Sequence, residues 1–167
     1  RTAVPEALAN PGDYAARSNL LWAGSLSHNG LTGTGNVGDF ACHAIEHEIG
    51  AMFDVAHGAG LTAIWSAWAK YVLHTKPERF AQFGVNVFGV ENDFDDPVAT
   101  GLRGIEAWDD WCHKIGLPTT LTELGIDPTP EQMREMAEGA VEARGGNLGG
   151  FCHLEASDVV AILEAAR

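Results

Sequence analysis

The residues best suited to carry chemistry lie in one short stretch, GTGNVGDFACHAIEH, at positions 33–47. Three patterns overlap there: the dinucleotide-binding pattern G-x-G-x-x-G at 33–38, the zinc-peptidase pattern H-x-x-E-H at 43–47, and a pair of histidines, His43 and His57. Each pattern implies a different chemistry, so each has to be tested against the structural context that its chemistry requires.

The glycine pattern needs a strand before it, a helix after it, and an acidic residue about 20 positions further on. The preceding residues 19–31, NLLWAGSLSHNGL, have a helical rather than an alternating pattern. Asp54 lies near the acidic position, but no second strand carries it. We therefore interpret residues 33–38 as a connector between helices, where glycine supplies backbone angles that other residues avoid. A glycine loop also allows a ligand to approach the backbone closely.

The H-x-x-E-H pattern places His43 and His47 one helical turn apart, a spacing that can chelate one metal ion. Glu46 would then be the general base of an inverted zinc peptidase. Such an enzyme needs a third protein ligand, a distant glutamate, and no glutamate of this sequence is marked out for that role. The mirrored pattern H-E-x-x-H fails, because Ala51 stands where the second histidine should be.

The pair of His43 and His57 predicts one imidazole on a helix and a second at the entrance to the next helix, from where it can fold back toward the first. Neutral imidazoles suit zinc or ferrous iron. Two histidines alone are an incomplete site, since a catalytic metal site has at least three protein ligands and an open position. The spacing thus leaves open both a metal role and a structural one.

The elements that must position these residues are helices, because the apolar spacing is helical throughout and we find no convincing alternating strand pattern. We expect Asp13, Asp39 and Thr129 to cap three of them. The helix that begins near His57 is apolar on most sides and should be the central buried one. The fold class predicted is all-α, with helices over residues 14–31, 40–53, 57–74, 78–90, 97–116, 130–143 and 155–167, and one helical turn in the connector 117–127.

The composition narrows the class of protein. The chain has 167 residues with 46% hydrophobic residues and a net charge of −13, which predicts a globular protein without a nucleic-acid or membrane partner. It contains no apolar run long enough to span a membrane and no visible signal peptide, so we expect a cytoplasmic location. Cys42, Cys112 and Cys152 are widely spaced and are expected to be free thiols. Trp65 and Trp68 are expected in the core, or else lining a small apolar pocket.

The stretch GDFACHAIEHEIGAMFDVAHGAGLTAIWSAWAKYV, with its H-x3-H-x9-H-G core, resembles the helical C-terminal domain of the iron-containing (group III) alcohol dehydrogenases. The resemblance is closest to the butanol dehydrogenase branch and continues through RFAQFGVNVFGV, GIEAWDDWCHKIGLPTTLTELGI and GGFCHLEASDVVAILEAAR. It implies the helical part of the fold shared with dehydroquinate synthase. The sequence departs from the family pattern at two positions. Ala56 stands before His57, where proline is frequent in the family, and Glu46 stands before His47, where a small residue is frequent. Both variants fit the butanol branch.

The resemblance implies that His43 and His57 are two of the four ligands of a divalent metal, Fe²⁺ or Zn²⁺. His47 would line the cleft without binding the metal, either as a catalytic histidine or as a histidine that only packs behind the ligands. The family's other ligands are an Asp and a His four residues later, on a helix that would precede Arg1, as would the domain that binds NAD or NADP. Residues 1–167 are accordingly expected to be a single helical metal-binding domain, inactive by itself.

The reaction implied is the reversible oxidation of a small primary alcohol, such as butanol, to its aldehyde by hydride transfer to NAD or NADP, in an enzyme expected to be a homodimer. Two alternatives stay open at this stage. One is a zinc metallopeptidase that uses the H-x-x-E-H pattern. The other is a non-enzymatic helical module that packs on a partner, with its histidines in the core.

Overall fold

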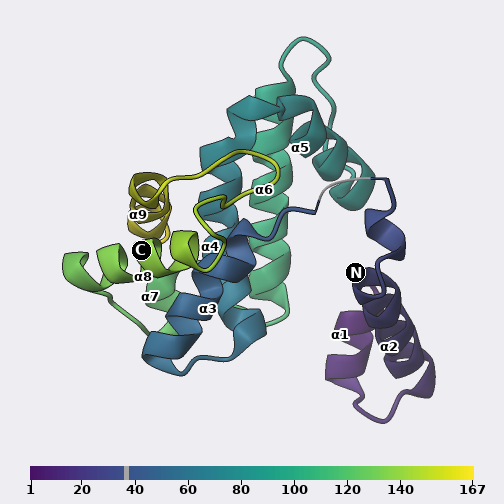
Figure 1. Cartoon of the computed structure of the whole chain (residues 1–167). Helices are drawn as coiled ribbons and strands as arrows, with labels where there is room; N and C mark the ends of the chain where they lie inside the picture. The colour runs from purple at the N-terminus through teal and green to yellow at the C-terminus, as the bar shows by residue number, and fades with distance from the viewer. Residues whose placement is uncertain (36–37) are drawn as a thin grey trace. The chain divides into compact units, whose positions relative to one another are not determined.

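The computed structural model describes residues 1–35 and 38–167, and these residues form helices joined by loops (Figure 1). Within the described ranges, an isolated antiparallel bridge between Leu148 and Leu154 is the only pairing of extended segments. The all-α prediction is confirmed. The chain divides into two compact units, residues 1–38 and 39–167. The expectation of a single domain over residues 1–167 stays a prediction.

The first unit contains α1 (Ala3–Ala9), α2 (Tyr14–His28) and the 3₁₀ turn η1 (Leu31–Gly33). Asp13 caps α2 as expected, since its Oδ1 accepts a hydrogen bond of 2.9 Å from the backbone N–H of Ala16. The sequence missed α1, because seven residues are too few to show a helical period. The helix predicted over 14–31 ends earlier, at His28.

The second unit holds the remaining helices. Its long helices agree with the prediction to within about three residues at most ends, and Thr129 caps α8 with a complete capping box. The helix predicted over 78–90 is in fact an α-helix that continues as a π-helical turn. The elements are α3 (Ala41–Phe53), α4 (His57–Val72) with η2 (Leu73–Thr75), α5 (Pro77–Phe83) with η3 (Gly84–Phe88), α6 (Pro97–Lys114), α7 (Leu121–Leu124), α8 (Pro130–Glu142) and α9 (Ala156–Ala165).

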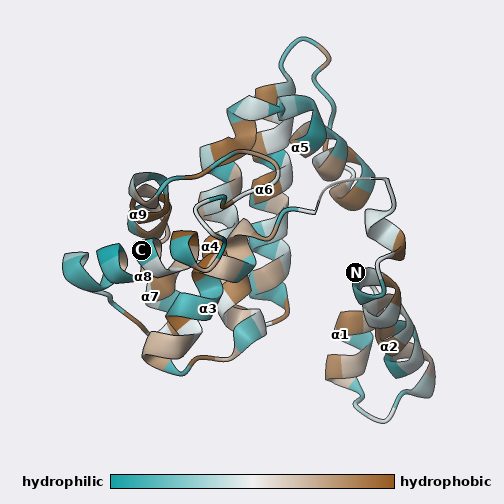
Figure 2. Ribbon diagram, viewed as in Figure 1, coloured by the Kyte–Doolittle hydropathy of each residue, from teal (hydrophilic) through white to brown (hydrophobic). Residues whose placement is uncertain are grey.

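Helix α4 is the centre of this unit, as its apolar sequence predicted. It packs against α3, α6, α7 and α9, and Ala63, Ile64 and Ala69 on it have no exposed surface. Figure 2 shows the contrast between the hydrophobic stretches of these helices and the largely hydrophilic loop between α5 and α6, which carries the acidic residues 91–96. The core therefore gathers around the helix that begins at His57.

Helices α5 and α6 approach each other through glycines. A Cβ atom on Gly104 would lie 2.6 Å from the Cα of Gly84, and one on Gly101 would lie 2.7 Å from Cδ1 of Leu73. Only glycine allows two backbones to come this close. This contact fixes α6 against the second unit's core, and α6 supplies one wall of the cavity described below.

None of the helices in the described part of the chain is both long and apolar enough to cross a membrane.

Candidate metal centre

Helix α3 divides its side chains between the core and an open side. Ala44, Ile45 and Ile49 are buried in the core, whereas His43 is half-buried and His47 is exposed. The two histidines share one side of α3 because residues four apart lie one turn apart. The local pattern thus presents two imidazoles together.

The start of α3 is fixed by Asp39. The cap position is Phe40, one residue later than expected, but Asp39 Oδ1 accepts a hydrogen bond of 2.8 Å from the N–H of Ala41. Its Oδ2 accepts hydrogen bonds of 2.9 and 2.7 Å from the N–H groups of Gly150 and Phe151. Asp39 therefore ties the first turn of α3 to the loop between α8 and α9.

A tight turn returns the chain from α3 to α4. Asp54 ends α3 in the left-handed conformation, with φ of 51°, and Ala56 is extended before His57 begins α4. Aspartate tolerates this conformation better than most residues. The turn folds His57 back beside α3, as the pairing of His43 and His57 requires.

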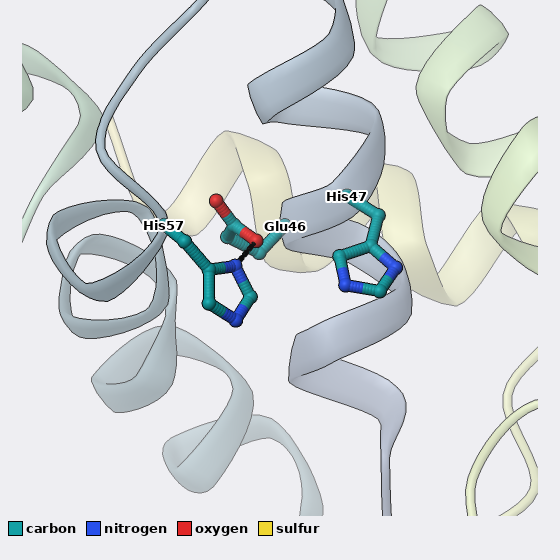
Figure 3. Close-up of side chains that lie close together, drawn as sticks. All are labelled: Glu46, His47 and His57. Carbon is teal, nitrogen blue, oxygen red and sulfur yellow. Dashed lines mark hydrogen bonds and ion pairs between the residues drawn. The ribbon is translucent and has the colours of Figure 1, made fainter.

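Three imidazole rings converge as a result. The ring centroids of His43 and His57 lie 5.5 Å apart, those of His47 and His57 also 5.5 Å, and those of His43 and His47 6.5 Å. Figure 3 shows His47 projecting from α3 beside His57. The structure thus brings together all three histidines that the sequence singled out.

The contact between Glu46 and His57 was not predicted from the sequence. Only 1% of it is exposed, and its Oε2 forms a hydrogen bond with Nδ1 of His57 (Figure 3). The one signal in the sequence was a glutamate placed between buried apolar residues of α3. The peptidase pattern gives Glu46 the role of a general base and does not indicate a contact with His57.

The geometry fits a divalent metal ion. One potential ligand atom from each of Glu46, His47 and His57 lies within 4.8 Å of the others, and no other three His, Cys, Asp or Glu side chains come this close in the described part of the chain. Atoms that share one zinc ion at about 2.1 Å are about 3–4 Å apart, so a small side-chain movement brings them into range. His43 lies outside this closest group, although its ring neighbours that of His57. Imidazole nitrogens are suitable donors for iron or zinc.

The sequence contains two D-x-x-x-H patterns, the spacing of the further ligand pair that the resemblance implies. Asp39 precedes His43 by four residues, but both its carboxylate oxygens accept backbone N–H groups. Asp109 precedes His113, but its carboxylate accepts a hydrogen bond from Ser66 and lies 3.8 Å from Lys70 Nζ. Neither aspartate belongs to the group of close ligand atoms around the histidine cluster, which consists of His43, His47 and His57.

A cavity of about 370 Å³ opens beside the cluster, between α3, α4 and α6. Its walls are mainly apolar. Trp68 belongs to the buried core, and both Trp68 and the half-buried Trp65 border this cavity, whose use as a substrate pocket stays a prediction. The lining residues are Asp39, Cys42, His43, Gly58, Leu61, Thr62, Trp65, Trp68 and Trp108.

The cysteines are free, as expected. Burial, reinforced by the negative charge of Asp39, raises the pKa of the Cys42 thiol far above its usual range. Burial, with the charge of Asp109, raises the pKa of Cys112 to about 11. Since a thiolate is the nucleophilic and metal-binding form, neither cysteine offers one at neutral pH.

Several known proteins are similar to this chain in sequence and fold. NADH-dependent butanol dehydrogenase A of Clostridium acetobutylicum is 33% identical over 159 residues, which cover 95% of this chain and 40% of that protein. NADPH-dependent aldehyde reductase YqhD of Escherichia coli is 29% identical over 86% of the chain. The crystal structure of NADH-dependent butanol dehydrogenase A from Thermotoga maritima superposes with a TM-score of 0.87 at 35% identity, covering 98% of this chain and 42% of that one.

The chain spans about 40% of the length of the curated butanol dehydrogenases to which it is similar. The sequence model of the Fe-containing alcohol dehydrogenase family, C-terminal part, matches residues 1–167. With the helical fold and the histidine cluster, this match shows that the chain belongs to the Fe-containing alcohol dehydrogenase family and corresponds to its C-terminal part.

Proposed function

We propose that this chain is the metal-binding part of an NAD(P)-dependent alcohol dehydrogenase that interconverts small primary alcohols and aldehydes. The observation that carries the proposal is the convergence of three imidazoles at the edge of an apolar cavity. The relatives named for butanol oxidation and aldehyde reduction support the substrate class.

His43 and His57 are the proposed ligands of the metal, Fe²⁺ or Zn²⁺. Their rings are 5.5 Å apart, and they come from two helices that the Asp54 turn holds together. When bound, the ion supplies Lewis-acid stabilisation of negative charge on the alcohol oxygen. By the resemblance, an Asp and a further His complete the ligand set, and we propose that they come from another segment of the enzyme.

His47 is the proposed catalytic histidine. It is exposed, and its ring lies 5.5 Å from that of His57, so it can reach a molecule held beside the ligands. An imidazole can accept or donate a proton near neutral pH. We propose that His47 contacts the substrate or transfers the proton of its hydroxyl group.

The cavity supplies the remaining contribution of this chain. His43 is on its wall, while Leu61, Trp65 and Trp108 give it an apolar surface. An apolar wall favours the carbon chain of an alcohol such as butanol and keeps water away from the reacting carbon. NAD or NADP would be bound by the other part of the enzyme.

The geometry favours this function over a zinc peptidase. A peptidase base must face the water that it activates. Glu46 is instead buried and hydrogen-bonded to His57.

Metal binding tests the proposal. We expect the 167-residue chain to bind Co²⁺ or Zn²⁺. Loss of a residue that only orients a ligand weakens metal binding about 10–100-fold. Loss of a ligand should weaken it further, so His43→Ala and His57→Ala should each exceed that range. His28→Ala is the matched control, because His28 lies in the first unit and bonds to Ser27. Equal affinity in all three variants would refute the proposed ligands.

Activity assays separate the candidate reactions. The chain alone should not oxidise butanol with NAD or NADP, because two ligands and the cofactor site are expected elsewhere. Butanol oxidation by the chain alone would overturn this division of the enzyme. If the chain hydrolyses a peptide and Glu46→Gln abolishes that hydrolysis, the peptidase function is supported instead of the dehydrogenase function.

A further inference from the structure

We propose that Glu46 is a positioning residue, which fixes the orientation and the protonated nitrogen of His57 so that His57 presents its other nitrogen to the metal. This inference rests on the proposed function, in which His57 is a ligand. It assigns to Glu46 a role that neither the peptidase pattern nor the resemblance provides.

The burial of Glu46 is the first argument. Its side chain is 2% exposed, whereas that of His57 is 52% exposed. A carboxylate removed from water requires a hydrogen-bonding partner, because an unpaired buried charge is strongly unfavourable. Nδ1 of His57 is the partner that the structure gives to Glu46. The pair therefore joins a buried carboxylate to an exposed imidazole, and the burial of Glu46 fixes the acceptor to which His57 is hydrogen-bonded.

The direction of this hydrogen bond decides the chemistry of His57. An ionised carboxylate only accepts hydrogen bonds, so Nδ1 must carry the proton. A neutral imidazole carries its single proton on the nitrogen that donates the hydrogen bond, and its other nitrogen is then the one that can bind a metal. Nε2 then keeps its lone pair, and in Figure 3 this nitrogen points away from Glu46. A histidine that donates to a carboxylate is also a stronger metal ligand.

Two glycines shape the space that Glu46 occupies. A Cβ atom on Gly60 of α4 would lie 2.7 Å from both Cγ and Oε1 of Glu46, and one on Gly50 of α3 would lie 3.4 Å from Oε1. The first contact is a clash and the second is close to ordinary van der Waals contact, so only Gly60 is required to be glycine by the place of Glu46. The side chain of Glu46 lies between α3 and α4, against Gly60, and its carboxylate contacts His57, the first residue of α4.

A second glutamate on the same helix provides a control. Glu48 is half-buried, and its carboxylate passes close to Gly139 of α8, where a Cβ atom would lie 2.6 Å from Oε2. Both residues are glutamates held against a glycine of a neighbouring helix, but only Glu46 contacts a histidine of the cluster. Comparing them separates the loss of a packed glutamate from the loss of the hydrogen bond to His57.

The test uses the full 167-residue chain and the variants Glu46→Gln, Glu46→Met and Glu48→Gln. Nitrogen-15 NMR of the metal-free chain reports which nitrogen of His57 is protonated. We expect Nδ1 in the wild type and in Glu48→Gln, and a shift toward Nε2 in Glu46→Met, which fills the space without accepting a hydrogen bond. Titration with Co²⁺ then measures the affinity, which should fall about 10–100-fold in Glu46→Met and less in Glu46→Gln.

Several results would overturn the inference. Unchanged protonation of His57 and unchanged Co²⁺ affinity in Glu46→Met would reduce Glu46 to a packing residue. Loss of binding as complete as in His57→Ala would make Glu46 a ligand instead. If the wild type binds no Co²⁺ but the NMR shift occurs, the proposed metal site fails while the contact that orients His57 stands.

Discussion

Replacing Gly60 with alanine should destabilise the chain, although the same change in a helix usually stabilises it. Alanine is about 1 kcal/mol more favourable than glycine within a helix. At Gly60, however, the new methyl group would lie 2.7 Å from Cγ and Oε1 of Glu46. Carbon atoms in contact prefer about 3.5–4.0 Å, so Glu46 or α4 must move by about 1 Å.

The magnitude follows from these two opposing effects. Overpacking of a buried site costs about 1–3 kcal/mol. Subtracting the gain in helix propensity leaves a loss of about 0–2 kcal/mol in the free energy of unfolding. Because Glu46 is buried, it cannot relieve the contact by moving into solvent. The movement should also weaken its hydrogen bond with His57 and lower Co²⁺ affinity in the same variant.

Urea unfolding of four variants measures these effects. Gly58→Ala is the control, since no atom lies within 4 Å of its added Cβ, and it should be neutral or stabilising by up to about 1 kcal/mol. In a chain that already carries Glu46→Ala, Gly60→Ala should also become stabilising, because the obstructing side chain is gone. If Gly60→Ala stabilises the wild-type chain as much as Gly58→Ala does, the packing argument for Glu46 is refuted.

Three further predictions concern the scaffold. Gly104→Ala should destabilise the chain by about 1–3 kcal/mol in thermal unfolding, because its Cβ would lie 2.6 Å from the backbone of Gly84; a neutral effect would contradict the close helix contact. Thr129→Ala should cost about 1 kcal/mol through loss of the α8 capping box, and Thr129→Ser, which keeps the hydroxyl, should lose less. The N–H of Thr119, 2.7 Å from the carboxylate, lowers the pKa of Glu123 below its usual range. The stability that Glu123 contributes should therefore be present above about pH 4.5 and be lost as the pH falls through the lowered pKa; the difference between wild type and Glu123→Gln, measured by urea unfolding, should shrink from about pH 7 to about pH 3, and a constant difference would contradict this.

Local sequence patterns predicted most of the helices, because apolar spacing and capping residues act over a few residues. Asp13 and Thr129 cap the helices expected of them. The apolar sequence after His57 correctly indicated the central helix. The helix α1 was missed because it is short, and the π-helical turn after α5 was missed because its residues follow a helical pattern that does not reveal the extra residue in the turn.

The glycine pattern shows the limit of motifs read without context. The segment before it is α2 and η1 rather than a strand, so the dinucleotide-binding interpretation lacks the element it needs. Asn36 and Val37, inside the pattern, lie outside the described residues, and the idea that the glycine loop admits a ligand stays a prediction.

The sequence by itself determined that His43 and His47 share one side of a helix, since an interval of four residues is one turn. Tertiary structure decided the rest of the site. The left-handed turn at Asp54 returns His57 to α3, Gly60 of α4 admits Glu46 between the helices, and α6 supplies one wall of a cavity beside the histidines. These contacts join residues on different helices, and their distances depend on how closely the backbones pack, which no local pattern specifies.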